Sequence, residues 1–232
     1  MFIRCLRSQY FVDDISSATP DNARMSWSLY DREGCRKYLT PRERAQFIRA
    51  ALTIGGKKGA FCAVVALCGP RISEALALAP LHLDDGNSAI NFETLKRRRR
   101  GIIRAVPVPA ELLELLEAVF RYRSIQSHPQ LARARLWPWC RTTGWKCIRD
   151  VMAVAGIPVH LSKPKALRHA FGIQATDDRI SLGLIKKWLG HAKIETTEIY
   201  TTPIGRQERA LARLTWRSIR KDLAKSAIRS VR

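Results

Sequence analysis

Helix-length stretches with apolar residues on one face dominate the chain, and the clearest of them begins near Thr40. In LTPRERAQFIRAAL, Thr40 suits a helix N-cap, Pro41 suits the first helical position and Glu43 completes a capping box. Apolar side chains then recur at helical spacing until GGKKG, at 55–59, which predicts a break. This pattern predicts an amphipathic helix with a defined start.

The next helix, over 60–68, is apolar on nearly every side, which predicts that it is buried at the centre of the domain. Gly69 and Pro70 end it. The same periodicity predicts further helices at 71–78, 110–124, 142–157, about 165–176 and 181–189, and a short helix around Tyr200.

Two short extended segments interrupt the helices. SAINFETLK, at 88–96, and GIIRAVPVP, at 101–109, flank the turn RRRRG, which predicts a β-hairpin. Pro107 and Pro109 predict that the second segment is an edge strand or ends there. The expected fold class is therefore mainly α with one small antiparallel sheet, an α+β fold.

The two ends of the chain differ from the middle. Residues 1–38 are weakly periodic and predict a short arm. Residues 206–232 carry apolar side chains at helical spacing among nine Lys or Arg, which predicts a basic amphipathic helix. The expected organisation is an arm at 1–38, one domain at 39–205 and this helix.

The net charge of the chain indicates a polyanionic partner. The 232 residues include 41 Lys and Arg against 20 Asp and Glu, a net charge of +21, and are 46% hydrophobic, enough for a core. A globular chain this basic usually meets nucleic acid or, as a second candidate, a membrane surface. No apolar run reaches the roughly 18 residues of a membrane-spanning helix, and the N-terminus lacks the apolar segment of a secretory signal. We expect a cytoplasmic protein.

The cysteines and acidic residues do not form a metal-site pattern. None of the six cysteines belongs to a C-x-x-C motif, and Cys62 and Cys68 lie in an apolar run typical of buried, reduced thiols. The acidic pairs at 84–85 and 177–178 are adjacent residues, typical of caps and turns rather than of a two-metal nuclease. We therefore expect no metal and no cofactor.

Candidate chemical groups recur along the chain, although each one alone is compatible with packing, capping or a solvated charge. Arg71 follows the Gly-Pro break, and Lys165 and Arg168 are three residues apart on one helical face beside His169. LGHAKIETTEIYT holds His191 and Tyr200. The hairpin, either a phosphate-binding element or a solvated turn with its flanks, carries Lys96, Arg97, Arg98, Arg99, Arg100 and Arg104.

Taken in order, these groups resemble the catalytic domain of tyrosine recombinases, the phage integrase family, over about residues 39–205. GPRISEAL resembles the first-arginine box, with Arg71 at the arginine and Glu74 as its acidic neighbour. Lys96 falls at the family's β-hairpin lysine, and KALRHAFG resembles the box of the second arginine, matched by Arg168. LGHAKIETTEIYT resembles the box of the last histidine and the nucleophilic tyrosine.

The resemblance implies a site-specific recombinase that cuts and rejoins double-stranded DNA through a 3′-phosphotyrosine, without metal or ATP. Tyr200 is then the nucleophile, Arg71 and Arg168 bind the phosphate, and Lys96 protonates the leaving 5′-oxygen. The remaining implied roles are proton transfer by Lys165 and His191, support by Glu74 and His169, and DNA contacts by the arginines of the hairpin. The family also implies a homotetramer on paired sites, assembled through the C-terminal helix, and a prokaryotic, phage or plasmid origin with the protein on nucleoid DNA.

Two departures from the family pattern stand out: Lys165 occupies a position that is usually His, and 1–38 is too short for the core-binding domain that usually precedes the catalytic domain. Three other readings stay open: a type IB topoisomerase, a regulator that binds DNA without cutting it, and a membrane-surface role for the helix at 206–232.

Overall fold

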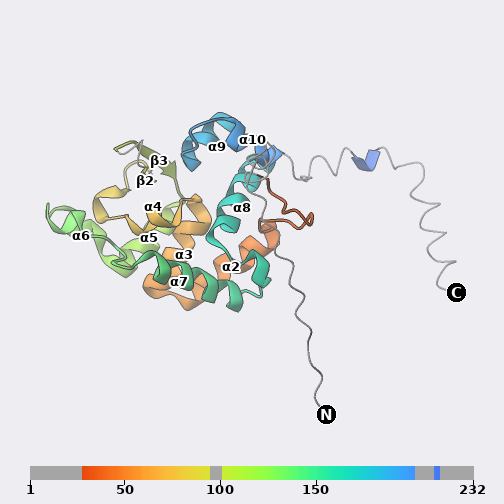
Figure 1. Cartoon of the computed structure of the whole chain (residues 1–232). Helices are drawn as coiled ribbons and strands as arrows, with labels where there is room; N and C mark the ends of the chain where they lie inside the picture. Colours follow the sequence, from red (N-terminus) through yellow and green to blue (C-terminus); the bar gives the residue numbers. More distant parts are fainter. Residues whose placement is uncertain (1–27, 95–100, 202–211, 215–232) are drawn as a thin grey trace, which may run out of the picture.

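The computed structural model describes residues 28–94, 101–201 and 212–214, and its helices surround a central helix, α3 (Gly56–Cys68) (Figure 1). Every α3 residue from Gly59 to Ala66 is buried. The longer helices that pack against α3 are α2 (Pro41–Ile54), α5 (Ala110–Phe120), α7 (Arg141–Val154) and α8 (Pro164–Asp177). The predictions of a central apolar helix and of a mainly α fold with a small antiparallel sheet are confirmed.

Helix α2 begins where the capping pattern predicts. The Thr40 hydroxyl accepts from the N–H of Glu43, and the Glu43 carboxylate accepts from the N–H of Thr40 at 2.8 Å. Arg36 adds an ion pair to the same carboxylate at 2.6 Å. The capping box therefore also anchors the segment that precedes the helix.

The predicted break over 55–59 is too long, because residues 56–59 already belong to α3. Only Gly55, with φ 64° and ψ −164°, separates the two helices. Gly59 lies so close to the carbonyl oxygen of Ala51 that a Cβ there would overlap it. Its missing side chain therefore allows close packing of α2 on α3.

The hairpin predicted from SAINFETLK and GIIRAVPVP is present and gains a third strand. Strands β2 (Ala89–Glu93) and β3 (Ile103–Pro107) pair antiparallel, and β1 (Leu83–Asp84) pairs with the other side of β2. The order β1-β2-β3 makes β3 an edge strand with Pro107 as its last residue, as the prolines predict. Two residues are too few to show a period, so β1 escapes sequence analysis.

Several helix boundaries differ from the prediction. Arg71 caps α4 (Ile72–Leu76), which is shorter than 71–78. The helix predicted over 110–124 is two helices, because Arg121 adopts a left-handed conformation with φ 52° between α5 and α6 (Tyr122–Gln126). Short 3-10 turns lie at Pro80–His82, Leu131–Arg133 and Val159–Leu161.

A second, smaller apolar cluster lies beside α8. It contains Leu29, Ile173, Ile185, Leu189 and Tyr200, which come from the first described segment, from α8, from α9 (Leu182–Leu189) and from the turn after α10 (Glu195–Glu198). Figure 1 shows α9 and α10 together at one end of α8. The cluster thus joins the end of the predicted N-terminal arm to the segment that carries Tyr200.

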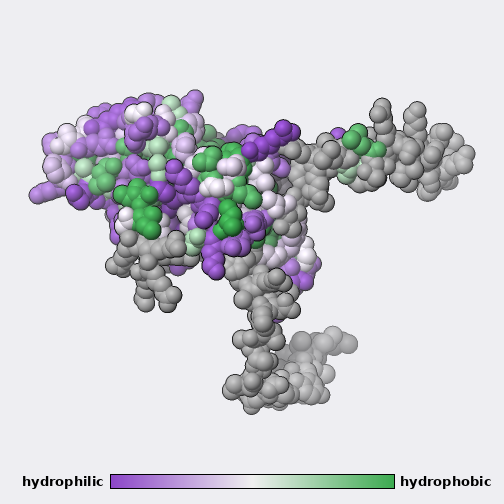
Figure 2. Space-filling model, turned by 90° about the horizontal axis from the view of Figure 1, so that it is seen from above, coloured by the Kyte–Doolittle hydropathy of each residue, from purple (hydrophilic) through white to green (hydrophobic). Residues whose placement is uncertain are grey.

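The surface seen in Figure 2 is hydrophilic over most of its described area, with scattered apolar patches. Among the residues that the structure describes, no helix is long and apolar enough to cross a bilayer. Cys62 and Cys68 are free, buried thiols as predicted, and burial raises the pKa of Cys68 to about 12.

Candidate active site

Arg71 and Glu74 form an ion pair at the start of α4. The backbone N–H and the Nη1 of Arg71 both donate to the Glu74 carboxylate, at 2.9 and 2.7 Å. The Arg71 side chain is 28% exposed to solvent, whereas the Glu74 side chain is only 1% exposed. Arg71 is therefore held along one edge while part of its guanidinium can meet an anion.

Arg104, one of the predicted DNA contacts, turns inward in the structure. Its side chain is 5% exposed, its Nη2 donates to Glu74 at 2.6 Å, and its Nε donates to the Trp188 carbonyl at 2.7 Å. Alternation along β3 places Arg104 and Val106 on the buried face and Ile103 on the exposed face. In this conformation the guanidinium is bonded to Glu74 and to the Trp188 carbonyl, and a DNA contact by Arg104 stays a prediction.

Glu74 stays ionised despite its burial. Desolvation alone would raise its pKa, but the charge of Arg104, the N–H of Arg71 and the charge of Arg71 lower the pKa below the ordinary carboxyl value. The buried carboxylate is therefore a fixed negative charge between two guanidiniums.

Arg168, on α8, bridges two distant segments. Its Nη1 donates to the Gly69 carbonyl at 2.8 Å and its Nη2 to the Leu189 carbonyl at 2.6 Å, and it is 8% exposed. Burial and then the positive charge of Arg71 lower its pKa to about 10, so it remains protonated at neutral pH. Because Gly69 precedes Arg71 by two residues, these bonds bring the two predicted phosphate-binding arginines to one place.

Two arginines also donate hydrogen bonds to the C-terminal end of α9. Arg104 and Arg168 each take one carbonyl of its last two residues, groups that have no partner within a helix. Gly190 then adopts a left-handed conformation with φ 63°, and a Cβ there would lie 3.1 Å from Nη1 of Arg104. The two arginines therefore define where the chain leaves α9 toward His191.

Tyr200 lies in a 3-10 turn, Ile199–Thr201, and is only 2% exposed. Its ring stacks on His191, with centroids 6.0 Å apart and an interplanar angle of 21°. On α8, a Cβ at Gly172 would lie 2.5 Å from the same ring. The phenol thus occupies a slot that exists only because residue 172 has no side chain.

The charge around this slot acts on the phenol. Burial raises the pKa of Tyr200 to about 12, while the charges of Arg168 and then Arg71 lower it. The two arginine charges therefore favour a negative charge on the Tyr200 oxygen, whereas burial opposes it.

His169 is a titratable partner of the phenol. Its Nδ1 lies 3.3 Å from the Tyr200 hydroxyl, and its Nε2 is buried without a partner among the described residues. Burial, then the charges of Lys165 and Arg168, lower its pKa to about 3, so the imidazole is neutral. A neutral Nδ1 without hydrogen can accept the hydroxyl proton.

His191 is positioned by its own segment. Its Nδ1 lies 2.9 Å from the hydroxyl oxygen of Thr197, which is fully buried in α10. Its backbone N–H donates to the Lys186 carbonyl at 3.0 Å. Thr197 belongs to the TT pair of the sequence motif, and its contact with His191 gives that pair a physical role.

Lys165 is exposed near the start of α8. Desolvation, then the charge of Lys37, lower its pKa. Its electrostatic effect on His169 shows that the lysine in the unusual position lies near the site.

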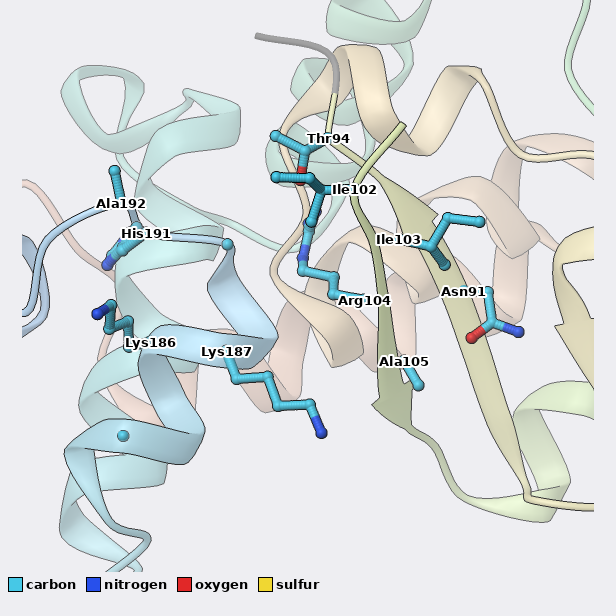
Figure 3. Close-up of a pocket in the computed structure, with 12 residues that line it drawn as sticks. Asn91, Thr94, Ile102, Ile103, Arg104, Ala105, Lys186, Lys187, His191 and Ala192 are labelled. Carbon is cyan, nitrogen blue, oxygen red and sulfur yellow. The ribbon is translucent and has the colours of Figure 1, made fainter. Parts of the chain in front are cut away.

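A cavity of about 680 Å³ opens beside the site, between the sheet and α9 (Figure 3). Ile102, Ile103 and Arg104 line it from the hairpin, and Lys186, Lys187 and His191 line it from α9 and the following turn. Lys186 and Lys187 were missed by sequence analysis, because a lysine pair in the last turn of a helix is equally typical of helix capping.

Other predicted residues lie outside the described part of the chain. These are Lys96 and Arg97, Arg98, Arg99 and Arg100 of the hairpin turn, and nearly all of the helix predicted at 206–232. Their roles stay predictions.

Within the described ranges, one group of side chains has metal-ligating chemistry, namely Asp31, Glu33 and Cys35. All three are exposed, and Oδ1 of Asp31 accepts from the N–H groups of the other two residues, as in a simple turn. None of the three belongs to the site around Tyr200.

A profile described as the phage integrase family matches residues 37–204, which is most of the chain. The chain belongs to the phage integrase family. Among curated members, tyrosine recombinase XerA of Pyrococcus furiosus is 32% identical over 139 residues, 57% of this chain and 46% of XerA. Tyrosine recombinase XerD of Mycobacterium tuberculosis is 32% identical over 144 residues, 57% of this chain and 43% of XerD.

Solved structures agree with this assignment. The crystal structure of XerA recombinase superposes with a TM-score of 0.60 at 26% identity, covering 79% of this integrase-family chain and 65% of that chain. XerH site-specific recombinase bound to palindromic difH substrate, a post-cleavage complex, gives a TM-score of 0.63 at 23% identity, covering 78% and 53%, and supports the fold. The matched region spans less than half the length of these two curated relatives.

Proposed function

We propose that this chain carries the catalytic centre of a site-specific DNA recombinase, with Tyr200 as the nucleophile. The observation that carries the proposal is that Arg168, through its bonds to the carbonyls of Gly69 and Leu189, joins the segment of Arg71 to the segment of His191, whose ring stacks on the buried Tyr200 phenol. A phosphodiester attacked by a phenol gains negative charge in the transition state. Fixed guanidiniums at that place stabilise the charge more strongly than water does.

In the proposed reaction, the Tyr200 oxygen attacks the scissile phosphorus, the P–O5′ bond breaks, and a 3′-phosphotyrosine and a 5′-hydroxyl form. The phenol proton passes to a neighbouring base, for which His169 and Lys165 are the candidates. The 5′-oxygen takes a proton from Lys96, and His191 donates to the phosphate. The covalent intermediate conserves the bond energy, so rejoining needs no ATP.

The described conformation holds Tyr200 away from a substrate. With 2% exposure and its hydroxyl beside His169, the phenol cannot reach a DNA phosphate as it stands. We therefore propose that DNA binding draws the turn of Tyr200 out of the slot against α8. That movement also relieves the desolvation that raises the pKa of the phenol.

The proposed DNA path runs across the hairpin and α9. Lys186 and Lys187 line the cavity between these elements, opposite the exposed Ile103 of the hairpin. Phosphates supply the affinity of such a surface and basic side chains neutralise them. XerH, which shares the fold, is described as bound to its palindromic difH substrate, and this supports DNA as the partner.

The test is trapping of the covalent intermediate. Duplexes that tile the DNA flanking the gene are nicked a few nucleotides downstream of each candidate cleavage position, so that the short 5′-hydroxyl fragment diffuses away. We expect a denaturation-resistant protein–DNA adduct, whose sequencing identifies the site. Binding without any adduct on all duplexes would instead favour the alternative of a DNA-binding regulator.

Assembly is part of the same proposal. A tetramer on paired sites would use the predicted helix at 206–232, with Trp216 as its apolar anchor, and would work on nucleoid DNA in the cytoplasm. Deleting residues 207–232 should then leave binding to one site and abolish the two-site complex, as measured by sedimentation of the protein on its DNA. If the truncated chain still recombines DNA, the helix at 206–232 does not have this role.

A further inference from the structure

The guanidinium of Arg104 connects β3 with two elements that lie next to predicted catalytic residues, since α4 begins directly after Arg71 and α9 ends two residues before His191. It extends from β3, pairs with Glu74 of α4 at 2.6 Å, and donates to Trp188 at the end of α9 at 2.7 Å. It also lies 5.3 Å above the ring of Phe92, its neighbour on β2. Figure 3 shows the side chain reaching from the strand toward the α9 side of the cavity.

The contact with Glu74 bears directly on Arg71. The Glu74 carboxylate uses Oε1 for Nη1 of Arg71 and Oε2 for both Nη2 of Arg104 and the backbone N–H of Arg71. The carboxylate thus accepts three hydrogen bonds, two from Arg71 and one from Arg104. Without Arg104, the carboxylate would lose the one of these bonds that comes from another element, and it would be restrained only by the arginine that it has to orient.

The surroundings of Arg104 are closely packed. The side chain is 5% exposed, and a Cβ at Gly190 would lie 3.1 Å from its Nη1 and 3.2 Å from its Nε. A lysine there could reach Glu74 or the Trp188 carbonyl, but a single ammonium cannot make both bonds in this planar geometry.

We propose that Arg104 is a positioning residue, which acts through Glu74 to aim the Arg71 guanidinium at the scissile phosphate. This inference rests on the proposed function. It differs from a DNA contact, because no phosphate needs to touch Arg104, and from a purely structural role, because its effect depends on the charge that Arg71 neutralises.

The experiment compares adduct formation on two nicked substrates, one with a normal scissile phosphate and one with an uncharged methylphosphonate at that position. The variants are Arg104→Lys, which keeps the buried charge and should fold, Arg104→Met and Arg71→Ala. Arg123→Met is the control, since Arg123 also pairs with two carboxylates, of Asp85 and Glu114, but at an exposed position. Thermal unfolding and DNA retention verify folding.

We expect Arg104→Lys to slow cleavage of the charged substrate by about 10²-fold, on the scale of losing one transition-state donor. On the methylphosphonate, the loss of rate should shrink to a few-fold, because the charge that Arg71 neutralises is absent. The loss should also be small when Arg104→Lys is added to Arg71→Ala, because the two substitutions remove the same interaction. Arg123→Met should cleave both substrates at the wild-type rate.

Three results would overturn the proposal: wild-type cleavage by folded Arg104→Lys, an equal loss on both substrates, or full additivity with Arg71→Ala. A reduced salt dependence of DNA binding in Arg104→Lys would assign it to a phosphate contact instead. A wild-type chain that forms no adduct would overturn the proposed function and this inference together, whereas wild-type adduct with an unaffected Arg104→Lys overturns the inference alone.

Discussion

Nδ1 of His169 lies 3.3 Å from the hydroxyl oxygen of Tyr200, in a place where both groups are almost fully buried. Burial keeps the imidazole neutral and the phenol protonated, with pKa values of about 3 and about 12. The pair is thus a neutral acceptor and a neutral donor at physiological pH. In the described conformation, the candidate nucleophile is therefore protonated.

Removing only the hydroxyl tests Tyr200 as the nucleophile. Tyr200→Phe keeps the ring in its slot beside Gly172 and His191, so we expect binding to flanking DNA within about a factor of three of wild type and complete loss of the covalent adduct. Gel retardation and a denaturing gel measure the two properties on the same samples. A Tyr200→Phe chain that still forms the adduct would assign the nucleophile elsewhere.

The slot itself is tested at Gly172. Gly172→Ala places a methyl group 2.5 Å from the Tyr200 ring, and we expect overpacking to lower the free energy of unfolding by about 1–3 kcal/mol. The displaced ring should also react faster with tetranitromethane, as measured by mass spectrometry of the peptide that contains Tyr200.

The matched control for that change is Gly183→Ala on α9, where a Cβ meets nothing within 4 Å. We expect no loss of stability there and up to about 1 kcal/mol of gain from helix propensity. Equal destabilisation by both variants would show that the Tyr200 slot has no special packing.

The buried imidazole predicts a pH dependence of stability. The pKa of His169 falls from 6.5 to about 3 on folding, so the unfolded chain binds the proton first as pH drops below 6.5. Stability present above pH 6.5 is therefore lost toward pH 3, by at most about 1.4 kcal/mol per pH unit for one group. His169→Gln should shrink the difference in unfolding free energy between pH 7 and pH 5.

Denaturant unfolding at the two pH values measures this difference. The exposed His128 offers the control, since His128→Gln should leave the difference at the wild-type size. If His169→Gln leaves it unchanged too, the imidazole is not held neutral in the folded chain.

The two arginines predict a specific loss of chemistry. Arg71→Ala should lower the rate of adduct formation by about 10²–10³-fold with a smaller effect on DNA binding, because its charge matters most in the transition state. Arg168→Ala should lower the rate by at least as much and also destabilise the fold, since its two bonds to Gly69 and Leu189 are buried. Single-turnover cleavage and thermal unfolding separate the two effects, and near-wild-type rates would refute the assignment.

Chelation distinguishes the proposed reaction from that of a nuclease. Protein cations supply the charge in the proposed mechanism, so EDTA should leave the rate of adduct formation unchanged. Inhibition by EDTA that Mg²⁺ reverses would instead indicate metal-assisted hydrolysis.

Local sequence signals determined the helices, the hairpin and the family. The capping box at Thr40 and the apolar run of α3 act over short distances, so their pattern alone placed these elements. The motifs around Arg71, Arg168 and Tyr200 likewise resembled the family before any contact was known. The left-handed Arg121 and the two-residue strand β1 carry no such signal, because each depends on what packs against it.

Only the tertiary structure decided how the candidate site is built. The sequence placed Arg104 among the arginines of the hairpin. In the structure, the alternation of side chains along β3 puts Arg104 on the buried face, where it contacts Glu74 and Trp188. Gly172 matters because the Tyr200 ring packs against it, and Thr197 matters because its hydroxyl contacts His191. In both pairs the partner comes from another element or turn. Residue types fixed which chemistry is available, while burial and long-range contacts fixed its charge states and its geometry, since desolvation and hydrogen bonding arise only when distant segments pack together.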